Sequence, residues 1–173
     1  EVDTGRHGHR AASPLERDIY MVPMMHLTTA APDLPLMREL YRRALLNLGL
    51  APEWKVYFAL WTQFVAQRAG EPAGEEIDAV LQRFARHAPW YGRLAAFGAG
   101  QIDGAALIAA ATTAGQRAEA HFYVGARQTA EGHASAAVES FDAVFATGMI
   151  NYVEYQMSRS LMETLRPSGE TTP

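Results

Sequence analysis

The sequence contains no cysteine. This absence excludes disulfides, thiolate zinc sites and a cysteine nucleophile. The sequence also has no apolar run of the roughly 20 residues that a membrane-spanning helix requires. The formal net charge is -4, and no basic stripe is present, so we expect no binding to the phosphate backbone of nucleic acids.

Known catalytic signatures are also missing. The sequence has no G-x-S-x-G, no H-E-x-x-H, no P-loop and no glycine-rich dinucleotide turn. The acid–base candidates are His87, His121, His133 and Glu119. Glu119 and His121 stand two residues apart, so their side chains diverge on a helix. His7 and His9 lie in a polar stretch where a solvated tail is expected. We therefore predict no catalytic residue, no cofactor and no metal site.

The composition is that of a folded, helical domain. Hydrophobic residues make up 49% of the 173 residues and charged residues 20%, a balance typical of globular proteins. The length predicts a single domain with its own core. Alanine is frequent and β-branched runs are few, so the expected fold class is all-α.

The stretch 118–147 predicts two antiparallel helices joined at Gly132, because glycine ends a helix at low cost. Gly125 and Ala137 stand on opposite sides of this turn and permit close approach of the two backbones. Phe141, one turn after Ala137, can fill the space beside them. This order of small residue, turn glycine, alanine and aromatic residue is typical of a tetratricopeptide (TPR) hairpin. An ordinary helical hairpin in another bundle is the alternative.

A second hairpin of similar length is predicted earlier in the chain. Apolar residues at helical spacing mark the helices 53–69 and 75–87, and the turn between them contains glycine and proline. Two short buried helices, 90–97 and 104–112, follow. The remaining predicted elements are a link over 113–116 and a capping helix over 151–165.

The N-terminal part is predicted to be a helical extension. Ser13 and Pro14 resemble a helix start, and Pro23 disfavours helix at the residue before it, so this helix should end at about Val22. A second helix is expected over 35–48. The predicted organisation is a flexible tail over 1–12, a helical extension over 13–52, a TPR-like α-solenoid domain over 53–166 and a tail over 167–173.

The C-terminal third also resembles a known family, the bacterial NlpI-type TPR proteins. Two segments carry the likeness, "E-A-x-F-Y-x-G" at 119–125 and "A-T-G-x-x-N-x-x-E-Y" at 146–155. The resemblance implies an exported, lipid-anchored scaffold for envelope enzymes. This chain has no cysteine to carry a lipid, so membrane association would come only through a partner or a removed anchor. Export to the periplasm is an expectation from the resemblance alone.

The predicted function is a protein–protein interaction scaffold or adaptor with a protein partner. In TPR-like pairs the first helix of each hairpin lines the concave side, so its polar residues are binding candidates. These candidates are Lys55, Gln63, Gln67, His121, Arg127 and Gln128. A permanent accessory subunit attached through 18–37 is a related hypothesis. The alternative from another class is a helical enzyme or small-ligand carrier with a pocket lined by Trp54, Tyr57, Trp61 and His121.

Overall fold

The computed structural model describes residues 14–165, which form nine α-helices and no strand. The helices are α1 (Pro14–Thr29), α2 (Leu34–Leu46), α3 (Pro52–Arg68), α4 (Glu75–Phe84), α5 (Trp90–Gly98), α6 (Gly104–Ala110), α7 (Ala114–Ala130), α8 (Ala134–Ala146) and α9 (Val153–Leu165). The all-α prediction is confirmed for this range. The predicted tails 1–12 and 167–173, with His7 and His9, lie outside the described residues.

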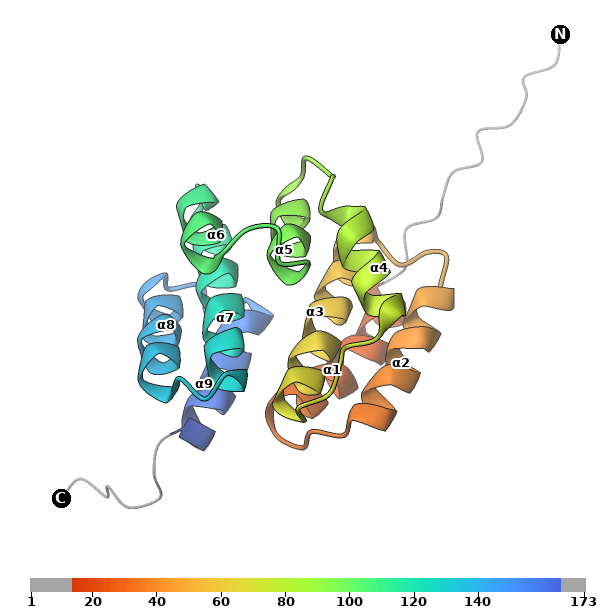
Figure 1. Cartoon of the computed structure of the whole chain (residues 1–173), viewed down its shortest axis with the longest axis horizontal. Coiled ribbons are helices and arrows are strands. Elements are labelled where there is room, and N and C mark those ends of the chain that lie inside the picture. Colours follow the sequence, from red (N-terminus) through yellow and green to blue (C-terminus); the bar gives the residue numbers. More distant parts are fainter. Residues whose placement is uncertain (1–13, 166–173) are drawn as a thin grey trace, which may run out of the picture.

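Two helices, α3 and α7, each lie at the centre of a group of packed helices (Figure 1). Helix α3 packs against α1, α2 and α4, and α7 packs against α6, α8 and α9. Helix α5 contacts both centres, α3 and α7 contact each other directly, and α1 reaches α9. The N-terminal helices therefore pack onto the same core as the C-terminal ones. Packed helix pairs such as α2–α3 and α7–α8 are present, while the finer assignment to TPR repeats stays a prediction.

Helix α3 is buried because it is apolar around almost its whole circumference. Pro52 occupies its first position and Glu53 its first turn, both favourable at the positive end of a helix. The buried residues of α3 are Val56, Phe58, Ala59, Leu60, Trp61, Thr62, Phe64, Val65 and Ala66. A helix that is hydrophobic on all sides belongs in the interior, and α3 accordingly has neighbours on several sides.

The α7–α8 hairpin packs as the small residues predict. A Cβ atom added at Gly125 would lie 2.8 Å from the Phe141 ring, so only glycine permits this approach. Ala137 and Phe141 are fully buried. Gly132 lies in the turn between the two helices and has a φ of 79°. This value falls in the left-handed region that glycine adopts without strain.

Helix α7 begins four residues before the predicted start. Thr113 and Gln116 form a capping box: the Gln116 amide donates to the Thr113 hydroxyl at 3.1 Å, and the Thr113 amide donates to the Gln116 side-chain oxygen. The predicted link over 113–116 was therefore wrong. The T-x-x-Q spacing is itself a helix-start signal, and it explains the correction.

The predicted end of the first helix at Val22 was also wrong. Helix α1 continues through Pro23 to Thr29. An internal proline costs about 3 kcal/mol, but continuation buries Met24 and Leu27 in the core, and each fully buried large apolar side chain contributes roughly 1.5–3 kcal/mol. Tertiary packing therefore outweighs the local preference.

The packing at Gly125 leads to a stability prediction. Substitution Gly125→Val should lower the free energy of unfolding by roughly 1–3 kcal/mol, because the added atoms overpack the contact with Phe141. Urea unfolding followed by far-UV circular dichroism measures the change. Ala79→Val, which adds the same branched side chain at an exposed position of α4, is the control. Equal stability of the two variants would contradict the proposed close packing.

Candidate functional site

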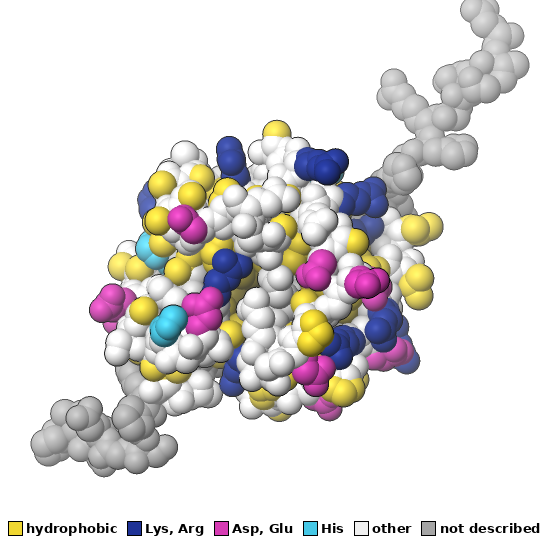
Figure 2. Space-filling view, in the orientation of Figure 1, with side chains coloured by type: hydrophobic (Ala, Val, Ile, Leu, Met, Phe, Trp, Pro, Cys, Tyr) yellow, Lys and Arg dark blue, Asp and Glu magenta, His cyan; other side chains and the backbone are white. Residues whose placement is uncertain are grey.

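Two large cavities adjoin different faces of α7. The first is an open groove between α5, α6, α7 and α8, with a volume of about 600 Å³. We call it the α5–α8 groove. It is lined by Phe97, Asp103, Gly104, Ala105, Ile108, His121, Val124, Arg127, Gln128, Glu131, Glu139, Ser140 and Ala143. Figure 2 shows this face hollowed, with hydrophobic side chains in the depression and charged side chains beside it.

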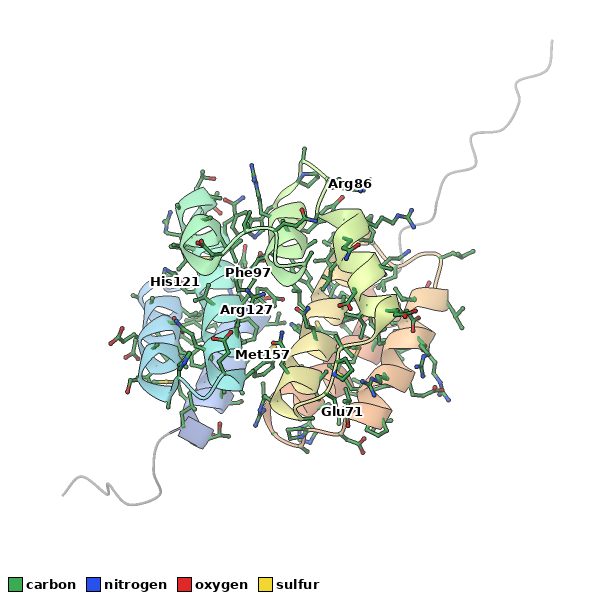
Figure 3. All side chains as sticks on the ribbon, viewed as in Figure 1. Glu71, Arg86, Phe97, His121, Arg127 and Met157 are labelled. Carbon is green, nitrogen blue, oxygen red and sulfur yellow. The ribbon has the colours of Figure 1, made fainter. Side chains whose placement is uncertain are left out.

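Arg127 is held in place at the edge of the groove. Its guanidinium lies 3.6 Å from the centre of the Phe97 ring and donates a hydrogen bond of 2.8 Å to the Phe97 carbonyl. Figure 3 shows Phe97, His121 and Arg127 close together on this side of the molecule. Burial lowers the pKa of His121, so its imidazole is neutral at pH 7 and can both donate and accept a hydrogen bond.

Carboxylates outnumber cations around the groove. Asp103, Glu131 and Glu139 contribute three negative charges against the single charge of Arg127. Asp103 also caps α6 by accepting a 2.8 Å hydrogen bond from the Ala106 amide. The groove is therefore apolar in its lining, acidic at its edges and supplied with several hydrogen-bonding side chains.

The structure brings together three of the six predicted binding residues. His121, Arg127 and Gln128 all line the groove, and Gln128 accepts a 2.7 Å hydrogen bond from the Ser140 hydroxyl. The other three do not line the groove. Gln63 and Gln67 border a small adjacent cavity of about 20 Å³ that Phe97 and Arg127 also line, and it is too small for more than a water molecule. Half-buried Lys55 lines neither the groove nor this small cavity.

Gln63 and Arg127 share a structural role that the sequence did not reveal. The Gln63 side chain donates a 3.0 Å hydrogen bond to the Gly98 carbonyl. The adjacent Phe97 carbonyl accepts from Arg127 in addition to the Gly100 amide. The last carbonyls of a helix lack partners within the helix. Side chains from α3 and α7 therefore cap the C-terminal end of α5 and fix one wall of the groove.

The second cavity contains two buried carboxylates. It has a volume of about 460 Å³ and is lined by Arg17, Met21, Glu53, Trp54, Tyr57, Glu119, Asn151, Tyr152, Val153 and Glu154. We call it the Glu119–Glu154 cavity. Glu119 and Glu154 are only 8% and 2% exposed. Glu119 accepts hydrogen bonds from the Tyr57 hydroxyl, at 3.2 Å, and from the Trp90 indole.

The two carboxyl groups have perturbed acidities. Burial raises the pKa of Glu119 to about 7, against the opposing effect of hydrogen bonds from Trp90 and Tyr57. Burial, reinforced by repulsion from Glu119, raises the pKa of Glu154 to about 8. Both groups are therefore partly protonated near neutral pH, which is unusual for glutamate.

The residues of the predicted aromatic pocket are divided between different environments. Trp54 and Tyr57 line the Glu119–Glu154 cavity. Trp61 is buried in the core, where its indole donates a 3.2 Å hydrogen bond to the Tyr123 hydroxyl, and His121 lines the α5–α8 groove. Glu154 was not among the predicted site residues, although a glutamate within the apolar face of the last helix indicates a buried charge.

Comparison with family models, curated proteins and solved structures finds no match to this chain. The described residues form an all-helical domain that has an open groove and a carboxylate-lined cavity. Over the described range, no helix has the length and hydrophobicity to cross a membrane. The same residues contain no cluster of three histidine, aspartate or glutamate side chains suited to a metal ion.

The buried carboxyl pair predicts a particular dependence of stability on pH. Glutamate loses its proton near pH 4.3 in the unfolded chain but near pH 7–8 at these native positions. Between these values the native state binds more protons, so stability falls as pH rises. Substitution Glu154→Gln, which mimics the protonated group, should flatten this fall and raise the melting temperature above that of the wild type at about pH 9.

Thermal unfolding followed by circular dichroism from about pH 5 to about pH 9 measures this effect. Glu163→Gln on the exposed face of α9 is the matched control and should leave the profile of the wild type unchanged. Parallel profiles for Glu154→Gln and the wild type would show that the Glu154 carboxyl has an ordinary acidity.

Proposed function

We propose that this chain is a protein-interaction module that holds an extended segment of a partner protein in the α5–α8 groove. The observation that carries the proposal is the groove itself. Side chains from four helices surround an open volume of about 600 Å³, within the range typical of ligand-binding clefts. A groove of this kind can accept a peptide without rearrangement of the helices that form it.

The lining of the groove favours a basic segment with an apolar anchor. Ile108, Val124 and Ala143, which are partly exposed, offer an apolar surface to one buried side chain. The excess of carboxylates around it attracts lysine or arginine side chains on either side of that anchor. Gln128 and neutral His121 can form hydrogen bonds with the peptide backbone of the bound segment.

We also propose that the helix pairs α3–α4 and α7–α8 are degenerate TPR-type hairpins. The joint of Gly125, Ala137 and Phe141 supports this assignment. The side-chain bonds from Tyr57 to Glu119 and from Trp61 to Tyr123 both span 62 residues, so α3 and α7 lie parallel, like the first helices of successive hairpins. Scaffolding within a bacterial envelope complex, as NlpI-type proteins perform, would follow from this assignment and from the segments 119–125 and 146–155.

Selection from a library of random dodecapeptides tests the proposed function. Enriched peptides should carry lysine or arginine next to a large apolar residue, and their affinity should fall as salt concentration rises. Fluorescence anisotropy with one labelled enriched peptide then measures the dissociation constant. Failure to enrich such sequences would contradict the proposal.

Matched variants locate the binding surface. The double substitution Glu131→Gln and Glu139→Gln should weaken binding of the labelled peptide by about tenfold and reduce its salt dependence, because two rim charges are lost. Glu75→Gln with Glu163→Gln removes the same charge from exposed positions outside the groove and should leave binding unchanged. Equal weakening by both pairs would show that only the net charge matters and that the groove is not the site.

A further inference from the structure

The Glu119–Glu154 cavity has a chemistry unlike that of the groove and independent of it. We propose that this cavity binds a small organic amine as its ammonium ion, paired with the two buried carboxylates and with its apolar body against the aromatic wall. The proposal goes beyond peptide binding at the groove, and its test involves no peptide.

The first argument is the unbalanced charge of the two carboxylates. Both line the cavity and are more than nine-tenths buried. Within the described residues 14–165, neither forms an ion pair with a lysine, arginine or histidine. A buried carboxylate without a cation is costly, so such a group tends to keep its proton. An ammonium ion within the cavity would stabilise the ionised carboxylates and supply N–H donors to them.

The second argument is the orientation of Glu119. Its two oxygens accept hydrogen bonds from different helices, one from Tyr57 on α3 and the other from Trp90 on α5. Burial raises the pKa of Tyr57, so its hydroxyl remains a donor over the physiological range. The Glu119 carboxylate is therefore held in one position before any ligand arrives, which lowers the entropic cost of binding.

The third argument is the aromatic wall. The rings of Trp54 and Tyr57 meet edge to face, with centroids 5.3 Å apart. The guanidinium of Arg17 lies 5.2 Å from the centre of the Trp54 ring, so a cation of the chain itself already occupies the face of this ring. The aromatic surface that Arg17 leaves uncovered can pack against the apolar body of an amine whose ammonium group pairs with the carboxylates.

The remaining charged and titratable groups favour the same ligand class. Glu53 adds a third carboxylate to the lining, and Tyr152 adds a further ring. The single cation of the lining, Arg17, is paired with Asp18 at 2.6 Å. The three carboxylates do not converge closely enough to hold one metal ion, since the described residues contain no such group of three side chains. An organic cation therefore fits the cavity better than a metal ion. A volume of about 460 Å³ suits a small molecule with an apolar body.

Isothermal titration calorimetry with 2-phenylethylamine tests the proposal on the full chain. The neutral 2-phenylethanol and the anionic phenylacetate have related shapes without the ammonium charge, and neither should bind detectably. Near pH 7 the ammonium ion displaces protons from the carboxyl pair to the buffer. The measured heat should therefore vary with the ionisation enthalpy of the buffer in the direction of proton release.

Two substitutions should change the affinity for 2-phenylethylamine in opposite directions. Glu154→Gln keeps the shape of the side chain and removes its charge, so binding should weaken roughly tenfold or more. Arg17→Gln removes a competing cation from the cavity lining and should strengthen binding. Glu163→Gln, on the exposed face of α9, should have no effect. Circular dichroism confirms that each variant is folded.

Three outcomes would overturn the proposal. The first is an absence of binding at millimolar 2-phenylethylamine, and the second is equal binding of 2-phenylethanol, which would show that the cavity recognises only the apolar body. The third is an affinity that neither Glu154→Gln nor Arg17→Gln changes, which would place the amine elsewhere on the protein.

Discussion

The direct contact between α3 and α7 is the constraint on which the rest of the structure depends. Two polar bonds cross it, from Tyr57 to Glu119 and from Trp61 to Tyr123, within an otherwise apolar interface. Each bond satisfies a donor in this interface. A buried donor left without an acceptor would lower the stability by about 1–3 kcal/mol. With these two helices side by side, Gln63 of α3 and Arg127 of α7 both reach the C-terminal end of α5. The remaining helices pack against α3 or α7.

Helix α7 also separates the two candidate sites. Glu119 and His121 differ by two positions and therefore by about 200° around a helix. The first points to the cavity shared with α3 and α9, and the second to the groove shared with α6 and α8. The spacing that excludes a Glu119–His121 catalytic pair thus places one helix between two cavities of different chemistry.

Local patterns predicted the all-α fold and the grouping of some residues around one candidate site. The hairpin around Gly132 follows from glycine, alanine and phenylalanine spacing, and the grouping of His121, Arg127 and Gln128 on one groove follows from their common helix. The end of α1 could not be predicted in this way, because Pro23 is tolerated only through the burial of Met24 and Leu27. The start of α7 was present in the sequence as a capping box and was overlooked.

The sequence by itself determined the helices, since periodicity, capping residues and turn glycines act over a few neighbouring positions. Only the tertiary structure decided that Glu119 and Glu154 would line the same cavity, that Trp54 and Tyr57 would border it, and that Trp61 would enter the core instead. These outcomes depend on contacts between helices far apart in the chain. Such contacts arise because each helix must bury its own apolar face, and the geometry that buries all of them together is not encoded in any single segment.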